Sequence, residues 1–178
     1  MRKLISYIAV SIDGKIADAL GGFAWLEELP NPDQSDYGYA EFFKTIDTTI
    51  MGNTTYQQVK ELIKPFPYLD KKNYVLTRNE ALADDEYATF FSSNHAKRIK
   101  ELKDQDGKGI WLIGGGEANS LCLDAGLLDE MLLFIMPYAM GKGIPLFADS
   151  QHEQELKLID SKVYTSGVVE LRYQVKHR

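Results

Sequence analysis

Three consecutive glycines, Gly114–Gly116, follow the apolar segment Ile110–Ile113 and precede a predicted helix that ends near Ala125. Glycine lets a ligand approach the backbone closely, and a helix N-terminus offers unpaired N–H groups with a partial positive charge. This combination suits a pyrophosphate, with Glu117 and Ala118 in the first helical turn. The alternative is a tight strand-to-helix turn that binds nothing. The segment matches neither the G-x-G-x-x-G fingerprint nor the G-x-x-x-x-G-K-[ST] phosphate loop, so both of those sites are disfavoured.

Polar residues follow two other predicted strands. They are Gly52, Asn53, Thr54 and Thr55 after the first of these strands, and Thr77, Arg78 and Asn79 after the second. The hydroxyl and amide groups can hydrogen-bond a phosphate or a ribose, and the guanidinium group can pair with a phosphate. Ordinary helix capping and an isolated surface arginine are the alternatives. Because open α/β sheets bind ligands at the carboxyl ends of their strands, we expect the three segments to line one edge.

The elements that must position these segments alternate along most of the chain. Strands are predicted over 4–10, 48–51, 73–76, 87–91 and 110–113, and helices over 36–46, about 55–63, about 94–103 and about 117–125. Asn53 or Thr54 is the expected N-cap of the second helix. Three strands, 131–137, 156–163 and 168–175, then follow without helices, with a hairpin turn at 165–167. This order predicts a mixed sheet, largely parallel, with an antiparallel C-terminal edge.

Composition narrows the class of protein. The 178 residues are enough to bury a core as one domain over residues 1–178. The net charge of −6 and the scattered basic residues argue against nucleic-acid binding. The single cysteine, Cys122, lies in an apolar stretch, and His95, His152 and His177 are far apart, so no metal site is expected. We find no membrane span or signal peptide and expect a cytoplasmic protein that binds a small molecule.

The order and spacing of five segments resemble two related families of reductases. Ile5–Val10, the block Ile50-Met51-Gly52-x-x-Thr55-Tyr56 and Ile113–Gly116 resemble dihydrofolate reductases. Ser11–Ala17 and the segment from Pro137 to Phe147 are similar to the RibD C-terminal domain of riboflavin-biosynthesis reductases. Together these segments span nearly the whole chain.

The resemblance implies a dihydrofolate reductase-like α/β fold of three layers, in which helices flank a central mixed, mostly parallel sheet of about eight strands. It also implies that NADPH lies across the strand ends. The implied contacts are Ala9, Val10 and Ala17 at the nicotinamide, Gly52, Asn53, Thr54 and Thr55 at the phosphates, Thr77, Arg78 and Asn79 at the adenosine, and Gly114, Gly115, Gly116, Glu117 and Ala118 at the pyrophosphate. A cis peptide between Gly115 and Gly116 is implied as well.

One position departs from the family pattern on the cofactor side. Dihydrofolate reductases commonly carry a basic residue just after the Met-Gly pair, where this chain has Asn53. Binding of the 2′-phosphate of NADPH would therefore depend on Arg78, which follows the neighbouring strand. If Arg78 points away, NADH becomes the alternative cofactor.

The substrate side rests on three candidate residues. Asp36 is the acid nearest the position of the buried carboxylate with which dihydrofolate reductases orient the pterin and help to protonate it. A carboxylate desolvated in an apolar cleft would have a raised pKa, which suits a general acid. A plain helix N-cap explains Asp36 about as well. Asp13 and Trp25 are the candidate substrate-binding residues, with a turn and the core as their alternatives.

Together these features favour a reductase that transfers a hydride from NADPH to a small heterocyclic substrate. Two substrates compete: a pterin such as dihydrofolate, and a 5-amino-6-ribosylaminouracil phosphate of riboflavin synthesis. The alternative function is that of a dinucleotide-binding protein that kept the fold without turnover. The apolar run Met131–Met136 and the habit of the family also favour a homodimer, although a buried central strand explains that run equally well.

Overall fold

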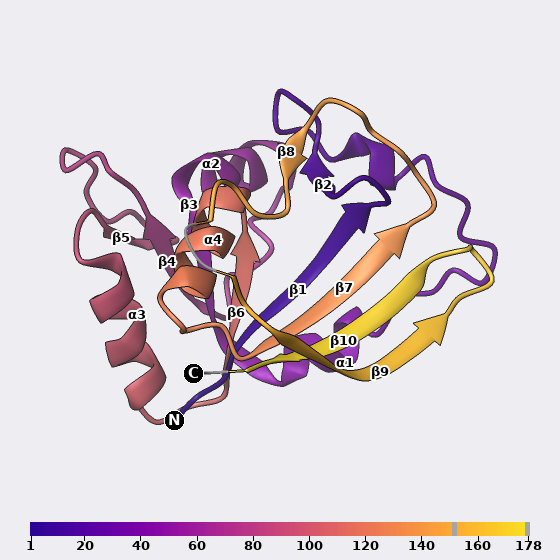
Figure 1. The fold of residues 1–178 in the computed structure, drawn as a ribbon. Helices are drawn as coiled ribbons and strands as arrows, with labels where there is room; N and C mark the ends of the chain where they lie inside the picture. The colour runs from indigo at the N-terminus through magenta and orange to yellow at the C-terminus, as the bar shows by residue number, and fades with distance from the viewer. Residues whose placement is uncertain (151–152, 177–178) are drawn as a thin grey trace.

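A computed structural model describes residues 1–150 and 153–176, whose elements follow the chain as in Figure 1. The strands are β1 (Leu4–Ser11), β2 (Lys15–Ala17), β3 (Ile46–Gly52), β4 (Lys72–Leu76), β5 (Thr89–Phe91), β6 (Gly109–Gly114), β7 (Glu130–Met136), β8 (Ile144–Pro145), β9 (Leu156–Val163) and β10 (Val169–Val175). The helices are α1 (Tyr39–Lys44), α2 (Asn53–Leu62), α3 (His95–Asp104) and α4 (Gly116–Asp124), with a short 3-10 helix, η1, at Ala24–Leu26. His152 and His177 lie outside the described residues.

The main sheet has eight strands in the order β5-β4-β3-β6-β1-β7-β10-β9. The first six of these strands pair in parallel. β10 pairs with β7 and β9 in antiparallel fashion, so β9 forms an antiparallel edge. The mixed sheet and its C-terminal edge are therefore confirmed. The hairpin turn at 165–167 is confirmed too, because the Gly167 N–H donates to the Tyr164 carbonyl oxygen at 2.9 Å.

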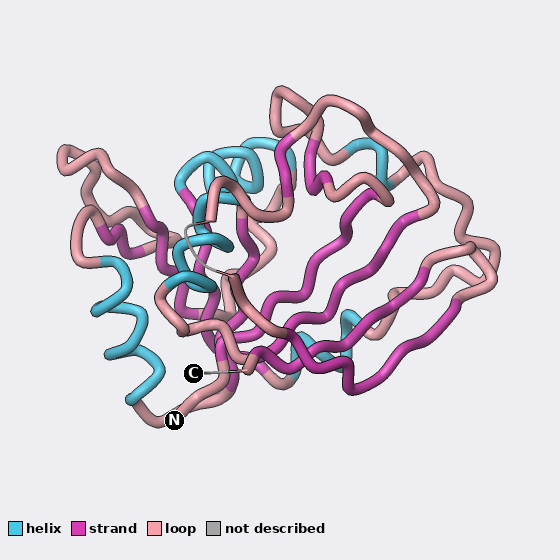
Figure 2. Tube along the Cα trace, viewed as in Figure 1, coloured by secondary structure: helices cyan, strands magenta, loops and turns pink. Residues whose placement is uncertain are grey.

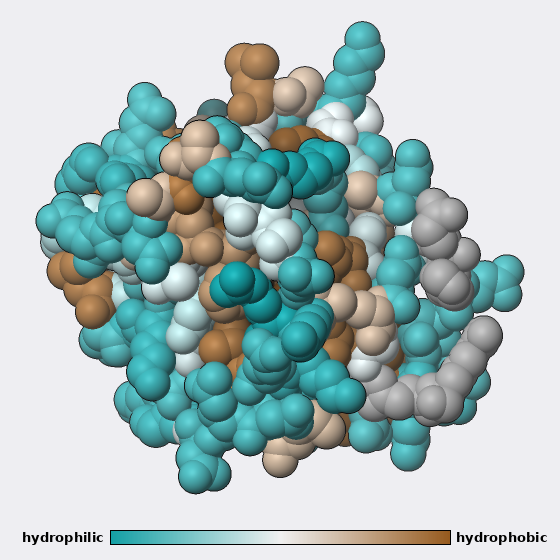
Figure 3. Space-filling view, turned by 90° about the vertical axis from the view of Figure 1, so that its left-hand side faces the viewer, coloured by the Kyte–Doolittle hydropathy of each residue, from teal (hydrophilic) through white to brown (hydrophobic). Residues whose placement is uncertain are grey.

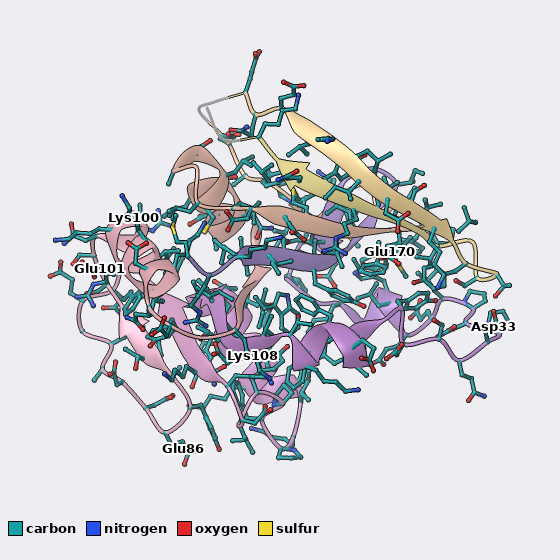
Figure 4. All side chains as sticks on the ribbon, turned by 90° about the horizontal axis from the view of Figure 1, so that it is seen from below. Asp33, Glu86, Lys100, Glu101, Lys108 and Glu170 are labelled. Carbon is teal, nitrogen blue, oxygen red and sulfur yellow. The ribbon has the colours of Figure 1, made fainter. Side chains whose placement is uncertain are left out.

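Helices cover both faces of this sheet and so build three layers. Ile50 faces a core that contains Ile99 of α3 and Cys122 of α4. Its neighbour Met51 faces a second core, on the side of α1 and α2. Successive residues of a strand point to opposite faces, so an uninterrupted apolar strand can serve both cores. Seen from below, α4 (orange-brown) and α1 (purple) lie on opposite sides of β1 (Figure 4).

The apolar run Met131–Met136 lies within β7. It pairs with β1 on one side and with β10 on the other, and most of its residues are buried. Burial at the centre of the sheet explains this run without a partner chain. A homodimer therefore stays a prediction.

Two local features differ from the expectations. The first helix begins at Tyr39 instead of Asp36, because Tyr37 and Gly38 have φ values of 53° and 81°, which a right-handed helix cannot accommodate. The strands β2 and β8 were not predicted; they form a separate two-stranded sheet beyond the end of β1 (Figure 2). Strands of three and two residues are too short to show a periodic pattern.

The surface over α3 and the 77–88 loop is largely hydrophilic, as the space-filling view shows (Figure 3). Residues such as Lys97 and Glu101 on α3 are exposed there. Within residues 1–150 and 153–176, no helix has the length and apolarity needed to cross a membrane.

Candidate functional site

The three predicted segments meet at one edge of the sheet. β4, β3 and β6 are parallel neighbours, so their carboxyl ends point the same way. Gly52 pairs with Leu76, the last residue of β4, and Met51 pairs with Gly114 at the end of β6. A Cβ atom on Gly52 would lie 3.9 Å from the Gly114 carbonyl oxygen. The expected convergence of the strand ends is confirmed.

Two helices begin side by side at this edge (Figure 1). α2 begins at Asn53, and its N-cap is Gly52 instead of the expected Asn53 or Thr54. α4 begins at Gly116, and its N-cap is Gly115. Glycine has no side chain to accept a hydrogen bond from the first helical turn, so neither helix has a side-chain N-cap. Two neighbouring helix N-termini with free N–H groups attract a group with more than one negative charge.

The three glycines at the end of β6 differ in burial and in backbone conformation. Gly114 is buried and has a φ of 115°, a conformation that L-residues rarely adopt. Gly116 is buried against β8, and a Cβ atom there would lie 2.5 Å from the Pro145 carbonyl oxygen. Only Gly115 is partly exposed, and a Cβ atom on it would meet nothing closer than Thr55 Oγ1 at 3.5 Å. Gly115, which faces Thr55, is therefore the glycine of this turn that a ligand could approach.

The cis peptide bond lies between Gly114 and Gly115, so its expected position between Gly115 and Gly116 is wrong. Gly115, the N-cap of α4, has an extended backbone conformation, and the helix begins at Gly116.

Arg78 points toward the first turn of α4. Its Nη2 atom lies 2.9 Å from Oε2 of Glu117, and both side chains are largely exposed. The pair joins residues that follow β4 and β6, the two strands on either side of β3. Both residues were predicted to contact the cofactor, but the ion pair between them was not predicted.

Thr77 and Asn79 build the turn that carries Arg78. The Asn79 N–H donates to Thr77 Oγ1, and the Ala81 N–H donates to Asn79 Oδ1. His95, which the sequence did not single out for this edge, places its Nε2 atom 3.0 Å from the Thr77 carbonyl oxygen and 2.9 Å from that of Phe91. His95 therefore connects the ends of β4 and β5. The contact with Thr77 joins residues 18 apart in the chain, so no local pattern predicts it.

Asp13 connects two loops near the same edge. Its carboxylate accepts hydrogen bonds from the Ser11 hydroxyl group and from the N–H groups of Met140 and Gly141. These hydrogen bonds, with that of Ser11 the strongest, lower the pKa of Asp13 to about 2. The carboxylate is thus ionised and occupied by the protein itself, as its interpretation as a turn-forming residue predicts. A contact with substrate stays a prediction.

Asp36 is exposed, and its carboxylate binds the first turn of α1. The N–H groups of Gly38 and Ala40 donate to its two oxygens at 2.9 Å each. The hydrogen bonds from Ala40 and Gly38 lower the pKa of Asp36. This shift of the pKa is opposite to the rise expected for a carboxylate in an apolar cleft, because the two N–H groups stabilise the charge more than desolvation disfavours it. The catalytic role of Asp36 stays a prediction.

Trp25 belongs to an apolar cluster on the α1 side of β1, together with Phe134 and Met136. Its ring is 7 % exposed and stacks on Tyr138 at a centroid distance of 5.5 Å. Its Nε1–H group is buried and has no hydrogen-bond partner among the described residues. A buried donor left unpaired is costly, so it calls for an explanation such as a bound water molecule or a functional role.

The predicted nicotinamide residues differ in their position relative to this cluster. Ala9 packs against the cluster of Trp25, whereas Val10, the next residue of β1, is buried and points to the opposite face. Ala17 ends β2 and pairs with Ile144 of β8.

The described residues contain no group of three or more histidine, cysteine, aspartate or glutamate side chains arranged to hold a metal ion.

Comparisons with known proteins agree with this architecture. The sequence model of the RibD C-terminal domain matches residues 2–170. The protein YwjB of Bacillus subtilis (strain 168) is 38% identical over 167 residues, which are 94% of this chain and 95% of that protein. The structure of a candidate riboflavin biosynthesis protein from Shewanella sp. PV-4 superposes with a TM-score of 0.86 at 28% identity, covering 98% of this chain and 99% of that one.

A dihydrofolate reductase from Enterococcus faecalis, solved with NADP(H) and RAB-propyl, superposes with a TM-score of 0.70 at 17% identity. The match covers 98% of this chain and 97% of that chain. The fold is thus that of dihydrofolate reductase.

Proposed function

This chain belongs to the RibD C-terminal domain family, and we propose that it is a reductase that binds NADPH and reduces a small heterocyclic substrate in the cytoplasm. The observation that carries the proposal is the pair of glycine-capped helix N-termini, α2 and α4, side by side at the strand ends. A dinucleotide has two linked phosphates that such a pair can bind. The reductase-type fold of the relatives supports the same conclusion.

The residues at this edge fit the cofactor, because Gly115 leaves a space beside the first turn of α4 that a Cβ atom would partly occupy. The N–H groups of the first turn of α4 would bind the pyrophosphate, and those of α2, with Thr54 and Thr55, a phosphate. Residues 77–79 would hold the adenosine, and Ala9, Val10 and Ala17 the nicotinamide. NADPH supplies the hydride when bound, and the protein orients the reactants and excludes water.

Trp25 supports the assignment of the substrate to the α1 side of β1. Its unpaired Nε1–H group can donate to a carbonyl oxygen or a ring nitrogen of a heterocycle. Of the two candidate substrates, a 5-amino-6-ribosylaminouracil phosphate fits better than a pterin. The pterin would require a buried carboxylate, whereas the carboxylate of Asp36 is exposed and binds α1. The Shewanella protein of similar structure is a candidate riboflavin biosynthesis protein.

Calorimetric titration with NADPH and with NADH tests the cofactor, and loss of absorbance at 340 nm over a panel of pyrimidines and pterins tests turnover. We expect saturable binding of dinucleotide and oxidation with a ribosylaminopyrimidine. Binding without oxidation across the panel would identify the non-catalytic alternative. Absence of binding at millimolar cofactor would refute the proposal.

The Trp25→Phe substitution is expected to lower kcat/KM for the heterocyclic substrate by roughly 10-fold or more, since a lost hydrogen bond to substrate costs about 1.5 kcal/mol. The melting temperature should fall only modestly, because the smaller phenyl ring leaves a cavity, while the stacking on Tyr138 is largely kept and an unpaired donor is removed. Steady-state kinetics and a thermal melt measure the two quantities. A loss of stability with unchanged kinetics would assign Trp25 to the core alone.

The Asp36→Asn substitution separates the two interpretations of Asp36. We expect kcat to be retained, because two N–H groups hold the carboxylate ionised and the lowered pKa leaves it no proton to donate near neutral pH. The melting temperature should fall slightly, since a neutral amide stabilises the start of α1 less well. A fall in kcat of two or more orders of magnitude would instead make Asp36 the general acid.

A further inference from the structure

The ion pair between Arg78 and Glu117 lies at the edge where the proposed dinucleotide would bind. Arg78 follows β4 and Glu117 lies in the first turn of α4, so the pair spans the end of β3. The side chains of Arg78 and Glu117 are 83 % and 76 % exposed, and their closest atoms are 2.9 Å apart. A pair this exposed adds little to stability, and a ligand can rearrange it easily.

These two residues carry all the formal side-chain charge of the three strand-end segments. Residues 52–55, 77–79 and 114–118 contain one cation, Arg78, and one acid, Glu117. The cation is therefore neutralised by a partner that lies beside the helix N-terminus. An acid in the first turn also occupies part of the positive field of α4 that an anionic ligand would use.

The two nicotinamide dinucleotides differ only at the 2′-position of the adenosine ribose. A phosphate at that position carries a charge between −1 and −2, is attracted by Arg78 and is repelled by Glu117. A hydroxyl group there is neutral and can donate a hydrogen bond to the Glu117 carboxylate. Glu117 thus weakens the binding of a 2′-phosphate and does not weaken the binding of a 2′-hydroxyl group.

Building on the proposed function, we infer that Glu117 is a specificity-determining residue for the cofactor. It holds Arg78 and repels a 2′-phosphate, so that it lowers the affinity for NADPH and leaves the affinity for NADH nearly unchanged. The protein therefore accepts both dinucleotides, with Kd values within about tenfold of each other. An exposed acid at this position separates this chain from one that selects NADPH strongly.

The Glu117→Gln variant of the full chain tests this inference by calorimetry with NADPH, NADH, adenosine 2′,5′-bisphosphate and AMP. We expect the Kd for NADPH and for the bisphosphate to fall about threefold to tenfold, and the Kd for NADH and AMP to change less than twofold. The gain should shrink as salt is raised from about 0.02 M to 0.5 M, because ions screen an exposed charge. Arg78→Gln should raise the Kd for NADPH and spare that for NADH.

Glu155→Gln is the matched control. Glu155 pairs with Lys176 as an exposed ion pair beside β9 and β10, at the opposite edge of the sheet. This variant should change neither Kd.

The possible failures are distinguishable. If the unmodified protein binds neither dinucleotide, the proposed function fails, and the inference fails with it. If the unmodified protein binds dinucleotide but Glu117→Gln leaves the ratio of the two Kd values within twofold, the inference alone is overturned. In that case a lower melting temperature would assign Glu117 to the stabilisation of α4.

Discussion

The Gly115→Val substitution is expected to raise the Kd for NADPH by about 100-fold or more while the protein remains folded. Gly115 caps α4, and a Cβ atom on it would meet Thr55 Oγ1 at 3.5 Å and Ile16 Cδ1 at 3.9 Å, both ordinary van der Waals contacts. The two methyl groups of valine would then extend into the space in front of the first-turn N–H groups. A pyrophosphate could no longer approach them.

Calorimetry gives the Kd, and circular dichroism with a thermal melt shows whether the fold persists. Ala125→Val is the control, because Ala125 is exposed at the C-terminal end of the same helix. It should bind NADPH as the unmodified protein does. If Gly115→Val binds NADPH normally in a folded protein, the pyrophosphate does not lie on α4.

Gly116 provides a contrast within the same turn. There a Cβ atom would come within 2.5 Å of the Pro145 carbonyl oxygen, so even alanine would displace β8. A substitution at Gly116 therefore cannot separate ligand binding from folding, whereas one at Gly115 can.

The Asp129→Ala substitution is expected to lower the free energy of unfolding by about 3 kcal/mol. Its carboxylate accepts hydrogen bonds from the Lys103 ammonium group at 2.6 Å and from the Leu4 N–H group at 2.7 Å. The Lys103 side chain is only 5 % exposed, and its other acceptor is the Leu127 carbonyl oxygen. Removal of Asp129 leaves a buried positive charge without its counter-ion, which costs far more than the loss of a surface pair.

Urea denaturation at neutral pH measures this effect. Glu41→Ala is the control, because Glu41 forms an exposed pair with Lys44 on α1 and should contribute less than about 1 kcal/mol. Adding Lys103→Met to Asp129→Ala should restore part of the loss, since it removes the stranded charge. If Asp129→Ala proves as mild as Glu41→Ala, water must solvate Lys103 more fully than its burial indicates.

Much of the fold could be predicted from local patterns. The predicted strands 48–51, 110–113 and 131–137 are central strands of the sheet, and the last two contain the uninterrupted apolar runs that are typical of strands buried on both faces. The glycines at 52 and 114–116 marked two of the strand ends that meet at one edge. Among them, Gly114 has a positive φ and Gly116 closely approaches the backbone of β8. These features depend on residues near one another in the chain.

The roles of individual side chains could not be predicted in this way. Asp36 looked suitable for a buried acid, but the conformations of Tyr37 and Gly38 direct its carboxylate to the start of α1. Arg78 looked like a free cation, but it pairs with Glu117, which is 39 residues away in the chain. Each role depends on which residues face each other after folding.

The order of residues alone was therefore enough to predict the mixed sheet and the edge at which its strand ends converge, since periodicity and glycine placement reflect the local backbone. The folded chain was needed to show that Gly115 is the open glycine, that Trp25 keeps a buried donor unpaired and that Arg78 is neutralised. Burial, hydrogen bonding and charge pairing are properties of contacts between distant segments. No pattern within one segment contains them.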